Sequence, residues 1–147
     1  MWFRQRCCPS NGPSALAQIA VAQAANCTAV VYTSRQVLSF ETAAARLSLG
    51  RAVSQLFTFL LRNLPEIGFL ITKGGITSND SLSQGLELSQ VRLLGQILPG
   101  ISLVQLAPDH PRFPLLPVVL FPGNVGQADS LTLAHKRIAH PQDQLSK

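Results

Sequence analysis

The chain has 147 residues, the usual size of a single domain and long enough to bury a sizeable core. Hydrophobic residues make up 46% of it and charged residues only 13%, a composition that excludes disorder over most of the length. The net charge is +5, but apart from Lys136 and Arg137 no two basic residues are adjacent. This scatter argues against a nucleic-acid surface and favours a small polyanionic ligand.

The cysteines and the hydropathy pattern indicate the compartment. Cys7, Cys8 and Cys27 have neither the spacing of a disulfide framework nor that of a CxxC metal pair. No stretch approaches the ~18 apolar residues of a membrane span. The alanine-rich run from Ala15 to Ala25 follows two arginines and weakly imitates a secretion signal, but glutamines interrupt it. We expect a protein of the reducing cytoplasm that does not bind membranes.

The N-terminal part is predicted to start with a disordered leader over residues 1–13. A short helix is expected over Ala15 to Ala25, because alanine and glutamine favour helices. Thr28 to Thr33 is an apolar, β-branched run that predicts a buried strand. A single domain is expected over residues 14–140, followed by a flexible tail over residues 141–147.

The clearest predicted helix spans Glu41 to Leu64 and ends before Pro65. Its apolar residues recur at steps of three and four and form one stripe: Leu49, Val53, Leu56, Phe57, Leu60, Leu61 and Leu64. Gly68 to Thr72 follows as another buried strand. Strand, helix and strand together predict a parallel, right-handed βαβ unit.

The C-terminal half is predicted to alternate short elements. A helix is expected over Thr77 to Leu86, and two apolar segments, Val91 to Ile97 and Ile101 to Leu106, are separated by a turn at Pro99-Gly100. After a proline-rich extended loop come a strand over Val118 to Phe121 and a helix over Ala128 to Ile138. The predicted fold class is therefore α/β, with a mostly parallel or mixed sheet flanked by helices in three layers.

The first candidate binding loop follows the strand that ends at Thr72. Gly74 and Gly75 allow a sharp turn and a close approach of the backbone to a ligand. Thr77 and Asp80 fit a capping box, which predicts the start of a helix, and a helix start suits a phosphate. The hydroxyls of Thr77 and Ser78 and the ammonium group of Lys73 could add contacts.

The second candidate loop, residues 121–126, has the same order of strand, glycine turn and helix. Its candidate residues are Gly123, Asn124 and Gly126. If the two strands run parallel, both loops emerge at one carboxyl edge of the sheet, where open α/β sheets bind their ligands.

Each of these features also has a plain structural explanation. Paired glycines after a strand often form only a turn, Asp80 can be a capping residue, and Lys73 can be a solvated cation. His110, His135 and His140 suggest no metal set, and Asp109 beside His110 has no nucleophile near it in the sequence. The sequence contains neither a Walker A motif nor GxGxxG, and it identifies no catalytic base. Residue chemistry alone therefore indicates an anion-binding edge.

Four segments in order resemble a known family: Val31 to Arg35, Ile71 to Asp80 (ITKGGITSND), Gly95 to Gly100, and Phe121 to Gly126 (FPGNVG). Over about residues 15–138 the chain is similar to the C-terminal nucleotide-binding domain of the four-carbon acid sugar kinases. That resemblance implies ATP, with Mg²⁺, as the ligand and threonate-like or erythronate-like sugar acids as the acceptors. It implies that Gly74, Gly75, Ile76, Thr77 and Ser78 form the nucleotide loop, and that Gly123 and its neighbours close on the same ligand.

The resemblance also implies an N-terminal sugar-binding half, which this sequence is expected to lack, and a serine-containing loop at the start of the nucleotide domain, which residues 1–13 do not match. We therefore expect this chain to be the nucleotide half of a kinase, inactive alone, with ATP and a separate sugar-binding chain or another copy of itself as partners. Two alternatives stay open. The chain could be a non-catalytic remnant or regulatory module that keeps the fold, or a plain interaction domain, as its low charge suggests.

Overall fold

A computed structural model describes residues 12–34 and 38–140 of the chain. Most of the predicted leader and the whole predicted tail lie outside the described residues. The chain divides into two compact units, Met1–Pro65 and Glu66–Lys147, and each is described separately below. The prediction of one domain over residues 14–140 crosses this division and stays a prediction.

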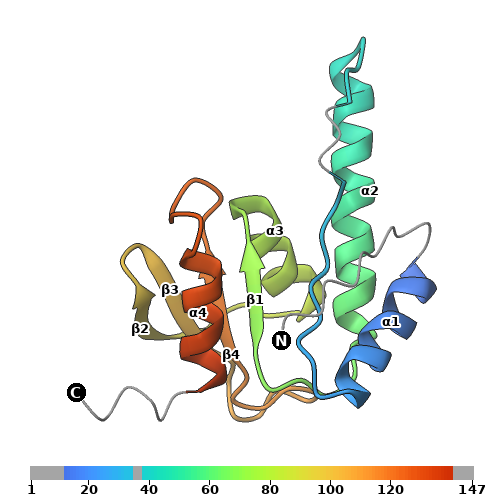
Figure 1. Cartoon of the computed structure of the whole chain (residues 1–147). Coiled ribbons are helices and arrows are strands. Elements are labelled where there is room, and N and C mark those ends of the chain that lie inside the picture. Colours follow the sequence, from blue (N-terminus) through green and yellow to red (C-terminus); the bar gives the residue numbers. More distant parts are fainter. Residues whose placement is uncertain (1–11, 35–37, 141–147) are drawn as a thin grey trace. The chain divides into compact units, whose positions relative to one another are not determined.

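The first unit contains two helices, α1 (Gly12–Ala24) and α2 (Ala43–Arg62), which contact each other (Figure 1). The Thr42 hydroxyl caps α2 by accepting a hydrogen bond from the Ala45 N–H at 3.2 Å. The helix ends at Asn63, two residues before Pro65. Both predicted helices are thus confirmed. No described helix is long and apolar enough to cross a membrane.

The predicted strand at Thr28 to Thr33 is wrong. The structure forms no strand over residues 27–34, and the side chains of Val30 and Tyr32 are exposed. β-branched composition describes residues that suit a sheet, but a strand also needs a neighbouring strand to pair its N–H and C=O groups. The predicted βαβ unit through α2 is therefore not formed either.

The second unit contains a mixed four-stranded sheet. Its strands are β1 (Leu70–Lys73), β2 (Arg92–Leu98), β3 (Ile101–Gln105) and β4 (Pro117–Phe121), in the spatial order β1-β4-β3-β2. β1 pairs in parallel with β4, and β3 is antiparallel to both β4 and β2. Gly100 has φ +74° and turns the β2–β3 hairpin, as Pro99-Gly100 predicts.

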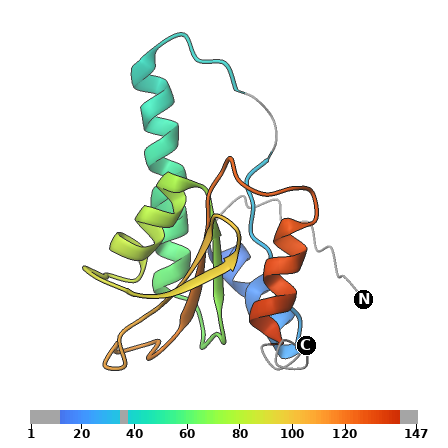
Figure 2. The same cartoon turned by 90° about the vertical axis from the view of Figure 1, so that its left-hand side faces the viewer.

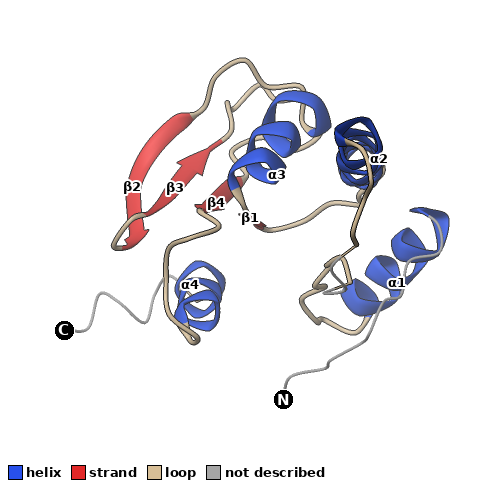
Figure 3. Ribbon diagram, turned by 90° about the horizontal axis from the view of Figure 1, so that it is seen from above, coloured by secondary structure: helices blue, strands red, loops and turns tan. Residues whose placement is uncertain are grey.

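Helices cover both faces of this sheet and make three layers, which confirms the predicted fold class. α3 (Gly75–Asp80) continues into a π-helical turn, η1 (Ser81–Gly85), on one face, while α4 (Ser130–Ala139) lies on the other (Figures 2 and 3). The core beneath α4 follows from strand alternation, which sends every second side chain to one face: Ile97, Ile101, Val119, Phe121 and Ala134 are buried together there. Rigid packing on both faces holds the strand ends in place.

The proline-rich loop between β3 and β4 is fixed by His110. Its Nδ1 accepts hydrogen bonds from the N–H groups of Phe113 (2.9 Å) and Arg112 (3.3 Å). Its Nε2 lies 3.1 Å from the Leu86 carbonyl oxygen, just after η1, and because Nδ1 is the acceptor, Nε2 carries the proton and donates. The imidazole thus joins this loop to the end of the helix that follows the first glycine turn.

Replacing His110 by alanine is expected to destabilise the second unit by about 1–3 kcal/mol, because backbone groups around buried Phe113 lose their partner. The free energy of unfolding in urea measures this. His140→Ala is the control, since His140 is exposed at the end of α4 and surface changes usually stay within about 0.5 kcal/mol. Equal stability of the two variants would contradict this role of His110.

Candidate functional site

The two glycine loops meet at one edge of the sheet. β1 and β4 are parallel neighbours with Lys73 opposite Phe121, so both loops leave from their carboxyl ends, at the upper edge of the sheet in Figure 1. The Gly74 N–H donates to the Phe121 carbonyl at 2.9 Å. A Cβ added to Gly123 would lie 3.7 Å from the Cα of Gly74. The expected convergence of the two loops is confirmed.

The first loop turns at Gly74, which has φ +106°, a conformation that side chains disfavour. α3 begins at Gly75 with Gly74 as its N-cap, and no side chain caps it. The predicted capping box is therefore wrong, because the helix starts two residues before Thr77 and places Thr77 and Asp80 inside α3. A glycine N-cap can start a helix without a hydroxyl since the turn itself supplies the geometry.

The start of α3 leaves backbone donors for a ligand. The first helical hydrogen bond runs from the Ser78 N–H to the Gly74 carbonyl at 2.9 Å. The N–H groups of Gly75, Ile76 and Thr77 precede it, and within the described residues no hydrogen bond of theirs is found. Anion-binding turns typically present several neighbouring backbone N–H groups of this kind after a glycine.

Two side chains brace this turn. Thr72 is buried, and its hydroxyl is hydrogen-bonded to Ser78 Oγ at 2.8 Å and to the Val119 carbonyl oxygen at 3.3 Å. The two hydroxyls and the Val119 carbonyl thus form a short hydrogen-bonded chain that holds Ser78 beside the turn. Sequence reasoning missed Thr72, although a hydroxyl at the end of an otherwise apolar strand was a visible signal.

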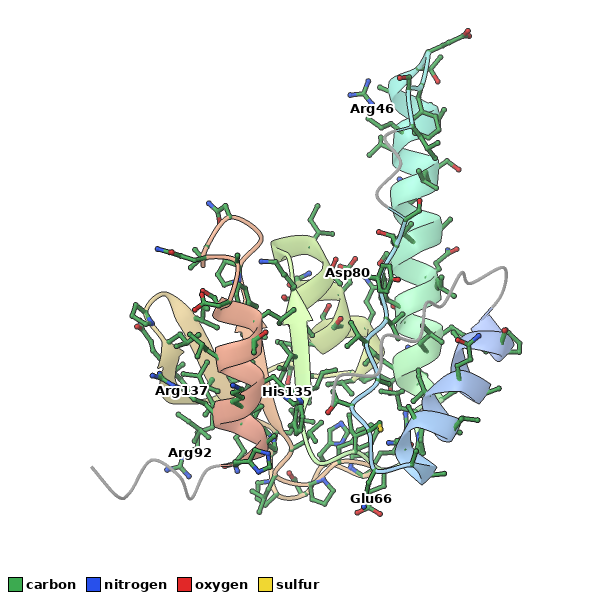
Figure 4. The ribbon with its side chains drawn as sticks, in the orientation of Figure 1. Arg46, Glu66, Asp80, Arg92, His135 and Arg137 are labelled. Atoms are coloured by element: carbon green, nitrogen blue, oxygen red, sulfur yellow. The ribbon has the colours of Figure 1, made fainter. Side chains whose placement is uncertain are left out.

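Lys73 connects the two loops. Its Nζ donates to the Pro122 carbonyl at 3.2 Å and lies 4.0 Å from the centre of the Phe121 ring. The exposed ammonium group is thereby held at the carboxyl edge by a hydrogen bond and a cation–π contact. Figure 4 labels two arginines of this unit, Arg92 on β2 and Arg137 on α4, and both lie below the carboxyl edge of the sheet in that view.

The remaining predicted residues of the first loop lie farther along α3 or point into solvent. Ile76 has 81% of its surface exposed. Asp80 is the last residue of α3, about 9 Å along the helix axis from Gly74 at 1.5 Å per residue. Its Oδ1 accepts from the amides of Asn79 and Gln84 at 3.4 and 3.5 Å. Its carboxylate thus contributes to the helix, and a direct role at the ligand stays a prediction.

The second loop contains two glycines, and the structure requires glycine at only one of the two positions. Gly123 has no left-handed φ, and nothing except Gly74 lies within 4 Å of an added Cβ. Gly126 has φ +92°, and an added Cβ would lie 2.9 Å from both Phe121 Cζ and Ser130 Cβ. Gly126 is therefore required by packing at the start of α4, whereas Gly123, beside exposed Asn124, leaves open space at the edge.

A third loop reaches the same edge. Because β3 is antiparallel to β4, the Pro99-Gly100 turn lies beside the end of β4. A Cβ added to Gly100 would lie 3.3 Å from Val125 Cγ1 in the second loop. The edge is thus lined in order by Gly74, Gly123, Val125 and Gly100.

The imidazole of His135 adds no positive charge at neutral pH. Burial, and secondly the nearby His140, lower its pKa from the ordinary 6.5. Its ring packs edge-on against Phe69, with centroids 5.6 Å apart, and Figure 4 shows it on the α4 side of the sheet. Within residues 12–34 and 38–140, no three His, Cys, Asp or Glu side chains gather into a metal site.

Comparison with known proteins places the chain in a family defined by its ligand. The chain belongs to the nucleotide-binding C-terminal domain family, which matches residues 8–131. The two glycine loops both fall inside that match. Nucleotide binding is therefore the property that the family assigns to this fold.

One solved structure is similar in fold. It is a crystal structure of a domain of unknown function (DUF1537) from Bordetella bronchiseptica, a domain-swapped dimer with bound citrate. The TM-score is 0.56 at 22% sequence identity, over 83% of this chain and 30% of that chain. The chain thus spans less than a third of that protein's length. No curated protein matches the chain.

Proposed function

We propose that the carboxyl edge of the sheet binds the phosphates of ATP, taken as its Mg²⁺ complex, and that the chain is the nucleotide half of a kinase acting on four-carbon sugar acids such as threonate or erythronate. In this proposal the three free N–H groups at the start of α3, the Ser78 hydroxyl and the Lys73 ammonium group contact phosphate oxygens. The family assignment supports the nucleotide, and the geometry of the loops supports the phosphates.

The close approach of the two loops at Gly74 and Gly123 carries this proposal. A Cβ added to Gly123 would lie 3.7 Å from the Gly74 Cα, so the two loops are close neighbours at the edge of the sheet. Gly75 and Gly123 are not required as glycines by φ or by crowding, since an added Cβ at Gly75 meets nothing within 4 Å. Glycine at two such positions is explained by a ligand that approaches the backbone closely.

Mg²⁺ would neutralise phosphate charge and is usually held by the phosphates, water and only one or two carboxylates. The described residues fit this pattern, because the edge is lined by hydrogen-bond donors that can bind phosphate oxygens and not by a cluster of carboxylates. If a carboxylate takes part from this chain, Asp80 is the nearest one along α3. Lys73, held beside Pro122 and Phe121, would add a positive charge for the phosphates.

The acceptor and the partner rest on the resemblance of the motifs and on the size of the similar structure. That protein is more than three times as long as the matched region, and it contains citrate, a hydroxy acid with several carboxylates. A sugar acid has the same functional groups. We propose that a separate sugar-binding chain or a second copy supplies the acceptor surface, because phosphoryl transfer depends on positioning both substrates.

The first part of the test is binding. Saturating Mg-ATP is expected to stabilise the chain, by about 2.7 kcal/mol at 100 times Kd, as measured by thermal unfolding and calorimetric titration. The second part is transfer. A mixture with a candidate sugar-binding half and threonate should release ADP, whereas either half alone should not.

The two parts separate the kinase from the alternatives. Binding without transfer in any mixture would leave a nucleotide-binding regulatory module. No binding of Mg-ATP at millimolar concentration would contradict the proposed site itself.

A further inference from the structure

We propose that Gln96 and the Pro99-Gly100 turn bind the nucleoside end of the ATP, so that the nucleotide lies along the sheet edge from β1 towards β2. This inference rests on the proposed function, because it assumes that the phosphates sit at Gly74 and Gly75. It assigns a role to a loop that the phosphates do not reach.

The dimensions of the edge fit an extended nucleotide. In the order β1-β4-β3-β2, the β2–β3 turn lies between two and three strand positions from the end of β1. Neighbouring strands are about 4.8 Å apart, which makes this distance roughly 10–14 Å. The triphosphate and ribose span a comparable length. Among the described residues β1 is the last strand on its side of the sheet, so the lined part of the edge extends from β1 towards β2.

Gln96 is positioned by the backbone around it. The strand pairing shifts register between Gln96 and Leu98, and Gly95 has φ +143°. The Gln96 side chain folds onto the turn, where its Oε1 accepts a hydrogen bond from the Gly100 N–H at 3.2 Å. This bond fixes the orientation of the carboxamide.

The oriented carboxamide of Gln96 still has hydrogen-bond donors for a ligand. Because Oε1 is the acceptor, both N–H groups of Nε2 are available, and among the described residues no hydrogen bond of Nε2 is found. The side chain is exposed at the edge. An oriented primary amide is a suitable partner for the acceptor atoms of a base or ribose.

Val125 supplies the apolar part of this surface. It is only half-buried, packs against the core beneath α4, and has its Cγ1 3.3 Å from where a Cβ on Gly100 would lie. Nucleoside sites combine apolar surface with a few placed polar groups. Val125 lies between Gly123 and Gly100, that is, between the proposed phosphate and nucleoside positions.

The experiment compares two ligands on the full chain, Mg-ATP and Mg-tripolyphosphate, by calorimetric titration. Gln96→Ala is expected to raise the Kd of ATP about three- to tenfold, the effect of one lost hydrogen bond, and to leave the Kd of tripolyphosphate unchanged. The matched control is Gln105→Ala, whose side chain bonds the Leu115 carbonyl at 3.2 Å near the opposite end of β3. It should change neither Kd.

A second variant tests the contact with the ligand while keeping the hydrogen bond to the turn. Gln96→Glu keeps an oxygen for the Gly100 N–H but removes the donors, and it should also weaken ATP more than tripolyphosphate. If Gln96→Ala and Gln96→Glu leave ATP binding unchanged, or weaken both ligands equally, the nucleoside assignment is overturned while the phosphate site stands. If the wild-type chain binds neither ligand, both proposals fall together.

Discussion

Gly126→Ala is expected to lower the free energy of unfolding by about 3 kcal/mol. The added methyl group would lie 2.9 Å from the ring of Phe121 and from the Cβ of Ser130, closer than carbon atoms approach. Phe121 is 98% buried and Ser130 starts α4, so neither can move without loosening the core. The left-handed φ of +92° adds strain.

Thermal unfolding of the ligand-free chain measures this effect, which corresponds to a fall in Tm of roughly 10 °C. Gly68→Ala is the matched control in the same unit, because an added Cβ there meets nothing within 4 Å and φ is not left-handed. The two variants should differ clearly. A Gly126→Ala protein as stable as Gly68→Ala would show that the loop before α4 is not packed as described.

Gly75→Ala should have the opposite profile, with unchanged folding and a Kd for Mg-ATP raised about tenfold or more, equivalent to ~1.4 kcal/mol. Gly75 is the first residue of α3, and an added Cβ has open space around it. Alanine is accepted at such a position and can even stabilise a helix. In our proposal that open space is where the phosphates approach, so the methyl group obstructs the ligand and not the fold.

Paired measurements of Tm and of the Kd values for Mg-ATP and Mg-tripolyphosphate test this prediction. Both ligands should weaken equally, in contrast to the ligand-selective effect expected at Gln96. Gly68→Ala again serves as control and should alter neither quantity. Unchanged affinity in Gly75→Ala would remove the main reason for placing phosphates at this turn.

Local signals in the sequence predicted most of the second unit correctly. Glycine and proline at positions 99–100 indicated the hairpin, and the apolar runs before Gly74 and Pro122 indicated the two strands that end at the site. The predicted α3 was displaced by two residues because Thr77 and Asp80 have the spacing of a capping box, while the turn at Gly74 starts the helix earlier. The sequence contains two possible helix starts here, and the backbone conformation of Gly74 selects the earlier one.

Long-range pairing was less predictable. Thr28 to Thr33 has the composition of a strand, yet the described chain forms none there. The parallel partner of β1 is β4, which follows more than forty residues later in the sequence, with Leu70 paired to Val118. Composition describes what a segment tolerates, whereas pairing depends on which backbone groups reach one another in the folded chain.

Residue identity alone thus determined the kind of chemistry at the site: flexible turns after buried strands, free backbone donors, hydroxyls and one cation, which together suit an anion. Only the tertiary structure decided that the loops at Gly74 and Gly123 lie side by side, that Gly126 serves packing, and that the Pro99-Gly100 turn, bonded to Gln96, shares the edge. The physical reason is that conformational freedom is a property of each residue, while contact between loops follows from strand order and from the parallel pairing of β1 with β4.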